Sequence, residues 1–335
     1  MLDAWFPPSP RVVHQLQEYL PWIARTSPPT NCEGLVATIA RCRALPPESI
    51  LAGAGSSTLM FLALREWLNA SSRVLLLDPT YGEYAHICDR IIGCQVDRFP
   101  LNPDEDFQVD LDKLADQLSM GYDLLVLVNP NNPTGRHIAR KELENFLDCA
   151  PQSTMVWIDE AYIDYVRPAE SLESYAASSA NVIVCKSMSK AYALSGLRVG
   201  YLCGHPQVIG PLLQLNPPWA VSLPGQVAAV AALQDVEYYQ ERYHETMLLR
   251  RELAGDLTSL PVARIVPGAA NFLLFYLPEE SCSKAELLER CKQQGLFLRD
   301  PSATTPWLGP KALRIAVKNK VTNKRMTQVL HDSVW

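Results

Sequence analysis

One segment of the chain combines a lysine with several groups that can bind an anion. It reads Ser187-Met-Ser-Lys190-Ala-Tyr-Ala-Leu-Ser-Gly-Leu-Arg198-Val-Gly-Tyr and follows an apolar run at residues 182–185. Ligands of open α/β sheets bind at the carboxyl ends of strands. Burial there favours the neutral amine, which is the nucleophilic form of a lysine. The serine hydroxyls and the Arg198 guanidinium would bind a phosphate or carboxylate beside it.

Three further segments place polar residues directly after apolar runs. Asn132 lies in Asn-Pro-Asn-Asn-Pro-Thr-Gly, which on its own predicts only a turn. Asp159 ends the run Met155–Asp159, where a carboxylate needs a partner unless it caps the next helix. The sequence Gly-Ala-Gly55-Ser56-Ser57 precedes a predicted helix, whose amino terminus would favour an anion.

The C-terminal part contributes cations. Arg314 lies inside the apolar run 312–317, and a guanidinium in a strand needs an anionic partner. Arg299 and Lys318 are nearby in sequence. Each could meet a second anionic group or be a solvated surface charge.

The elements that would position these residues alternate along the chain. Nearly continuous apolar runs predict strands buried on both faces, as in a parallel sheet; they are Arg73–Asp78, 123–128, Met155–Asp159 and 182–185. Helical patterns fall between these runs, at 59–68, 84–92 and 141–149. This alternation over about residues 50–205 indicates an α/β fold with a mainly parallel sheet.

The remainder has an α+β pattern. We expect a long helical stretch over 226–257, strands at 262–266, 271–276, 296–299 and 312–317, a helix at Lys284–Gln293 and a closing helix. The sequence therefore predicts a large domain at residues 30–238. A small domain would combine residues 1–29 with 239–335.

Composition excludes several classes of protein. Among 335 residues, 30 Lys and Arg stand against 36 Asp and Glu, and the net charge of −6 argues against a nucleic-acid partner. No run approaches the roughly 20 apolar residues of a membrane helix, and the first residues lack a signal-peptide pattern. The nine cysteines contain no C-x-x-C pair, so we expect reduced thiols, no metal site and a cytoplasmic enzyme.

The segments around Lys190, Asn132 and Asp159 together resemble the aminotransferase class I/II superfamily of fold type I pyridoxal-5′-phosphate (PLP) enzymes. The resemblance extends over about residues 5–330. It implies the PLP-dependent transferase fold, with a mainly parallel seven-stranded sheet between helices and a small α+β C-terminal domain. It also implies PLP as the cofactor.

The resemblance assigns a cofactor role to individual residues. Lys190 matches the Schiff-base lysine that also acts as general base, and Asp159 matches the carboxylate that pairs with the pyridine nitrogen. Tyr81 matches a catalytic aromatic residue that stacks on the pyridine ring of the cofactor. The alternative for Tyr81 is packing in the core. The matches to phosphate-binding groups are Gly55, Ser56, Ser57, Ser187 and Arg198, and those to groups that bind the 3′-oxygen are Asn132 and Tyr162.

Substrate contacts follow from the same resemblance. Arg314 matches the arginine that binds the substrate α-carboxylate, with Asn271 near it. Arg299 is a candidate for a second anionic group. Ser27 stands where the family has a tyrosine that reaches the neighbouring subunit, so we expect a homodimer with the site near the subunit interface.

Two branches of the superfamily are similar to this chain: histidinol-phosphate aminotransferase and L-threonine-O-3-phosphate decarboxylase. We expect an aminotransferase that passes an amino group from an L-amino acid to a 2-oxo acid through Schiff-base and quinonoid intermediates. The alternatives are an amino-acid decarboxylase or an eliminating or cyclising lyase. A non-catalytic PLP-binding sensor is a more remote alternative, since such proteins usually carry a DNA-binding segment.

Overall fold

A seven-stranded sheet forms the centre of the larger part of the chain. The computed structural model describes residues 2–258, 264–302 and 305–334. The strand order is β1-β7-β6-β5-β4-β2-β3, and only β7 runs against the others. The strands are β1 (Ile50–Gly53), β2 (Arg73–Asp78), β3 (Gln95–Pro100), β4 (Leu124–Val128), β5 (Met155–Asp159), β6 (Val182–Ser187) and β7 (Gly200–Cys203). The predicted α/β fold with a mainly parallel sheet is confirmed.

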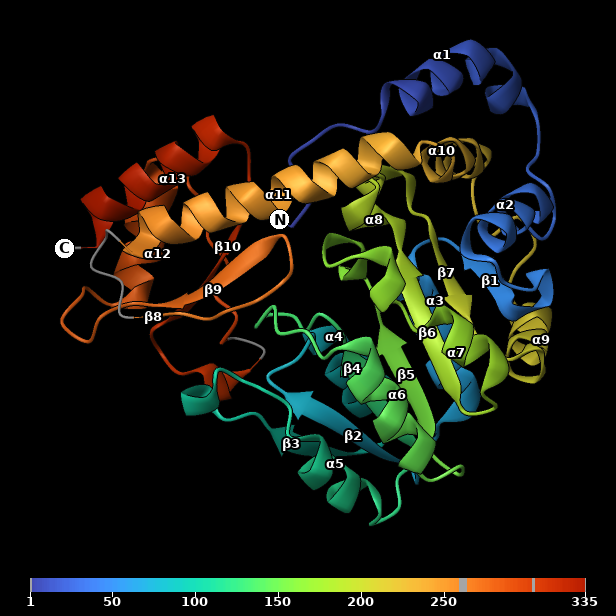
Figure 1. Ribbon diagram of the computed structural model, residues 1–335, viewed down its shortest axis with the longest axis horizontal. Coiled ribbons are helices and arrows are strands. Elements are labelled where there is room, and N and C mark those ends of the chain that lie inside the picture. The colour runs from blue at the N-terminus through green and yellow to red at the C-terminus, as the bar shows by residue number, and fades with distance from the viewer. Residues whose placement is uncertain (1, 259–263, 303–304, 335) are drawn as a thin grey trace.

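Helices cover both faces of this sheet (Figure 1). The central strands are buried along their whole length, which explains their unbroken apolar sequence. Two clusters of buried side chains lie on opposite faces of the sheet, since successive residues such as Leu75 and Leu76 belong to different clusters. The helices are α2 (Glu33–Arg43), α3 (Ser56–Trp67), α4 (Gly82–Ala85), α5 (Leu111–Leu118), α6 (Arg140–Cys149), α7 (Glu173–Ser178), α8 (Met188–Ala191), α9 (Pro206–Leu215) and α10 (Leu223–Leu233).

The smaller part is built on a three-stranded antiparallel sheet with its own apolar cluster. Its strands are β8 (Arg264–Ile265), β9 (Phe272–Tyr276) and β10 (Ala312–Ala316), and its helices are α12 (Lys284–Gln293) and α13 (Lys320–Ser333). Helix α11 (Val236–Thr258) extends from the large sheet toward this smaller part (Figure 1). The predicted domain boundary at residues 238 and 239 stays a prediction.

Two expected elements differ from the structure. The helical pattern at 226–257 forms two helices, because α10 ends at Leu233 and α11 begins at Val236. Asp235 lies in this break, and aspartate disfavours a helix interior. The stretch 296–299 is not a strand, since only Arg299 pairs with β10, through Arg314. The start of the strand expected at 262–266 lies outside the described residues.

The first residues of the chain run along α11 toward the large sheet, and helix α1 (Pro10–Arg25) follows them (Figure 1). Trp5 Nε1 donates to Thr246 Oγ1 at 2.9 Å, and the Tyr238 hydroxyl donates to the Pro7 carbonyl at 2.8 Å. Phe6 packs edge-on against Tyr238 and Tyr239. These contacts hold residues 2–9, here called the N-terminal strap, in one position.

All nine cysteines are free. Across the described ranges we find no helix that is both long enough and apolar enough to pass through a membrane.

Candidate active site

A cavity of about 230 Å³ opens at the carboxyl ends of the parallel strands. Four strand ends contribute to it: Tyr81 follows β2, Asn132 follows β4, Asp159 ends β5, and Lys190 comes just after β6. Parallel strands end at one edge of a sheet, so residues far apart in sequence meet there. The other lining residues are Leu2, Asp3, Ser56, Val128, Ala161, Tyr162, Ser187 and Arg314. The cavity thus contains Lys190 and seven other residues predicted to belong to the site.

The amino terminus of α3 and Arg198 form an anion-binding corner. Gly55 has φ +87°, and a Cβ built on it would lie 2.5 Å from Nη2 of Arg198. No side chain caps the first amides of α3, which leaves those at Ser56 and Ser57 free to bind a ligand. Arg198 is oriented by Ser189, whose hydroxyl accepts a 3.2 Å hydrogen bond from Nη1. A phosphate is the group that this set of donors suits.

Asp159 is a buried carboxylate at the floor of the cavity. Its Oδ2 accepts a 2.7 Å hydrogen bond from the Tyr84 hydroxyl, and its Oδ1 accepts one at 3.0 Å from the Ala161 amide. Burial raises the pKa of Asp159 above its ordinary value, although these hydrogen bonds and the Lys186 charge oppose the shift. A cationic ring N–H would compensate this carboxylate.

Arg314 reaches the cavity from β10. One of its Nη atoms donates to Oδ1 of Asn132, and the guanidinium lies 5.5 Å from the Phe272 ring centroid. Nε of Arg314 and Oδ1 of Asn271 are buried without a hydrogen-bond partner. Burial lowers the pKa of Arg314. A substrate carboxylate would pair with this half-buried cation.

The two tyrosines predicted for the site have different surroundings. Tyr162 is buried against the edge of Phe272, with ring centroids 5.3 Å apart, and burial raises its pKa. Tyr81 is 37% exposed, so it is not packed as a core residue and its ring is accessible from the cavity. Tyr165, which was not predicted, donates from its hydroxyl to the Lys190 carbonyl at 2.9 Å.

A second cavity of about 370 Å³ adjoins the first and shares Tyr81, Asn132 and Arg314 with it. Arg299 lies in this second cavity together with Glu83 and His86. Arg299 is therefore separated from Lys190 and placed where a substrate side chain could extend.

Sequence reasoning missed Asp3. Its Oδ1 lies 3.4 Å from Lys190 Nζ and accepts a 2.6 Å hydrogen bond from the Ser195 hydroxyl. Lys318 donates to the Asp3 carbonyl at 2.9 Å, and Asn271 Nδ2 donates to the Leu2 carbonyl at 3.0 Å. The N-terminal strap thus completes the wall of the Lys190 cavity. The available signal was that Asp3 is the one charged residue in the otherwise apolar stretch 2–6.

Ser27 does not reach the Lys190 cavity of its own chain. It lines an apolar cavity of about 750 Å³, with Tyr19 and Trp22 of α1 and Leu223 of α10. A contact with a neighbouring subunit stays a prediction.

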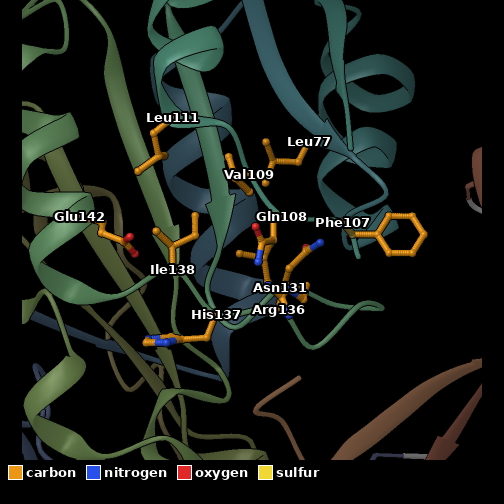
Figure 2. A pocket seen from close by; sticks show the side chains of 11 residues that line it. Leu77, Phe107, Gln108, Val109, Leu111, Asn131, Arg136, His137, Ile138 and Glu142 are labelled. Atoms are coloured by element: carbon orange, nitrogen blue, oxygen red, sulfur yellow. The ribbon is translucent and has the colours of Figure 1, made fainter. Parts of the chain in front are cut away.

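A further cavity of about 160 Å³ is lined in part by the loop that follows β4 (Figure 2). Its lining includes Asn131, Arg136, His137 and Glu142, whose side chains are labelled in Figure 2. None of the predicted site residues lines it. This cavity therefore lies outside the predicted site.

Comparison with known proteins places this geometry in a family. The model of the aminotransferase class I and II family matches residues 25–332. A histidinol-phosphate aminotransferase from Moorella thermoacetica (strain ATCC 39073 / JCM 9320) is 32% identical over 295 residues, which cover 87% of this chain and 74% of the relative. The chain belongs to the aminotransferase class I and II family and is an enzyme.

Solved structures share the fold at lower sequence identity. Histidinol-phosphate aminotransferase from Sinorhizobium meliloti, solved in complex with pyridoxal-5′-phosphate, superimposes with a TM-score of 0.89 at 22% identity, covering 99% of this chain and 89% of that one. L-threonine-O-3-phosphate decarboxylase from Porphyromonas gingivalis gives a TM-score of 0.84 at 22% identity, covering 99% and 97% of the two chains. These likenesses confirm the predicted fold type.

The residues of this chain fit such a phosphorylated pyridine cofactor. The corner formed by Gly55, Ser56 and Arg198 suits the phosphate, and the buried Asp159 carboxylate suits a pyridine N–H. Lys190 lies in the same cavity to receive an aldehyde. Among the described residues, no three His, Cys, Asp or Glu side chains gather as metal ligands.

Proposed function

We propose that this chain is a PLP-dependent aminotransferase that acts on the amino group of an L-amino acid and uses a 2-oxo acid as acceptor. One observation carries the proposal: a single cavity brings together Lys190, the buried carboxylate Asp159 and the half-buried cation Arg314. These are a nucleophile, a partner for a ring nitrogen and a partner for a carboxylate.

Each residue has a distinct part in this reaction. Lys190 would hold the cofactor through its aldehyde. The cofactor, when bound, supplies an electron sink for the bonds at the substrate α-carbon. Asp159 keeps the proton on the pyridine nitrogen, and Arg314 orients the α-carboxylate. Once the substrate amine has replaced it, Lys190 would accept the proton from the substrate α-carbon and deliver it to C4′, the carbon that had carried the aldehyde of the cofactor.

The surrounding side chains position the reactants. Asn132 contacts Arg314 and lines both cavities, so it lies where the cofactor ring and the substrate carboxylate would meet. Tyr81 and Tyr162 would bracket the ring, one by stacking and one through its hydroxyl. The cavity around Arg299 would receive the substrate side chain.

A decarboxylase is the second candidate, supported by the structural likeness to L-threonine-O-3-phosphate decarboxylase. The same residues would serve this reaction if the bond broken at the α-carbon were that to the carboxylate. Arg299 beside Arg314 could then bind a second anionic group of the substrate.

We further propose a homodimer whose interface includes the apolar cavity beside Ser27, since Trp22 and Tyr19 are exposed there. We also propose that the enzyme is cytoplasmic, which its nine free cysteines support.

The cofactor assignment is tested by spectroscopy. Purified protein mixed with PLP should show a visible absorption band, and Lys190→Ala should abolish it while the exposed control Lys141→Ala retains it. Absence of the band in the unsubstituted protein would contradict the assignment. Incubation with an amino-acid panel and 2-oxo acids, scored for keto acid or for amine and CO₂, separates the two reactions.

A further inference from the structure

The N-terminal strap brings a carboxylate to the nitrogen that would hold the cofactor. Asp3 Oδ1 lies 3.4 Å from Lys190 Nζ, and neither side chain is fully exposed. Asp3 is itself fixed, because the Ser195 hydroxyl donates to the same oxygen at 2.6 Å and Lys318 binds its backbone carbonyl. The position of this carboxylate is therefore set by the fold.

Asp3 is charged at neutral pH. The hydrogen bond from Ser195 is the main cause that holds the pKa of Asp3 below its ordinary value, and the charges of Lys190 and Lys318 add to it. Lys318 is the other cation facing this pair, and burial lowers its pKa. The neutral hydroxyl of Tyr162 and the more distant Asp159 and Arg314 line the same cavity.

We propose that Asp3 is a positioning residue that stabilises the proton on the Lys190 nitrogen when that nitrogen is joined to the cofactor. This inference rests on the proposed function. The amine of Lys190 condenses with the aldehyde, forming a C=N bond and releasing one water. The nitrogen of that bond carries a positive charge when protonated, and an adjacent carboxylate favours the charged form. The protonated form is the one that a substrate amine attacks.

The experiment follows the visible band of the PLP-loaded enzyme against pH. Asp3→Asn should move the midpoint of the spectral change down by about 1 pH unit, because it removes an opposite charge within about 4–6 Å. Asp3→Glu should return the midpoint toward that of the unsubstituted enzyme, since it restores the charge. If Asp3 served only to hold the strap in place, the midpoint would not fall in Asp3→Asn and return in Asp3→Glu.

Trp5→Phe is the matched control. It removes the hydrogen bond between the strap and Thr246 but leaves the Asp3 charge in place. We expect an unchanged midpoint. An unchanged midpoint in Asp3→Asn would overturn the inference, as would an equal shift in Trp5→Phe, which would assign the effect to the strap's position. If the unsubstituted enzyme shows no band at all, the proposed function fails and this inference fails with it.

Discussion

The Tyr84 hydroxyl donates a 2.7 Å hydrogen bond to Oδ2 of Asp159 beneath the cavity, and both side chains are buried. The same hydroxyl accepts a 2.8 Å hydrogen bond from Trp157 Nε1. Tyr84 therefore links the floor of the site to the core of the sheet. This contact keeps the Asp159 carboxylate aimed into the cavity.

Tyr84→Phe should destabilise the protein. The substitution leaves the Trp157 N–H without a partner and removes the hydrogen bond that the Tyr84 hydroxyl donates to the buried Asp159 carboxylate. The expected loss is about 1–3 kcal/mol in the free energy of unfolding. Chemical denaturation of the cofactor-free protein measures this cost. Tyr175→Phe is the control, because Tyr175 also donates to an aspartate, Asp148, but at an exposed position. Equal losses in the two variants would contradict the assignment.

Asp159 should give the cofactor-free protein a pH-dependent stability. Burial raises its pKa, so the folded chain takes up a proton at higher pH than the unfolded chain. The stability of the unsubstituted protein relative to Asp159→Asn should therefore increase as pH falls from 7 through the raised pKa, and level off below 3.8. The free energy of unfolding should increase by about 1.4 kcal/mol for each pH unit that separates the folded and unfolded pKa values of Asp159. A flat difference in unfolding free energy between pH 7 and 4 would refute this.

Arg314→Lys should weaken substrate use. Lysine lacks the planar pair of donors that the half-buried guanidinium offers to the substrate carboxylate, which costs about 2–4 kcal/mol, or roughly 30- to 1,000-fold in kcat/KM. Steady-state kinetics with the preferred amino acid measure the loss, and we expect most of it in KM. Arg41→Lys, at an exposed position on α2, should leave kcat/KM unchanged. A similar loss in both would remove the special role of Arg314.

Gly55→Ala should lower the affinity for PLP. The backbone of Gly55 (φ +87°, ψ 160°) lies in a region that is essentially restricted to glycine, so alanine there costs about 1–3 kcal/mol. The added methyl group would also displace the Arg198 guanidinium from the anion-binding corner. Fluorescence or absorbance titration with PLP measures the affinity. Gly196→Ala is the control, since its Cβ would meet no atom within 4 Å; an equal weakening there would contradict the role given to Gly55.

The parts of the fold that sequence predicted best are those with the strongest local pattern. Strands β2 and β5 have the predicted bounds, because residues buried on both faces must be apolar at every position. The break between α10 and α11 was missed, because both helices continue the same helical pattern on either side of only two residues, Gln234 and Asp235. The stretch 296–299 has strand-like residues but makes only one bridge.

The site residues that could be predicted are likewise those that lie in a local sequence pattern. Lys190, Asn132 and Asp159 each stand at a strand end within a local motif, so their meeting follows from the order of parallel strands. Asp3 is 187 residues from Lys190, and no periodicity connects them. Its place depends on how the strap packs against α11, which is a tertiary contact that a local pattern does not encode.

The strap also has a consequence for the order in which the protein is completed during synthesis. Asp3 leaves the ribosome well before Lys318, which binds its carbonyl and follows 315 residues later. At the usual 5–20 residues per second, that interval is roughly 15–60 s. The large sheet, whose last strand ends at Cys203, can form within that time. The wall of the Lys190 cavity cannot form in that time, because it needs Lys318 to hold the strap. The nascent chain should therefore acquire its core well before it acquires a closed site.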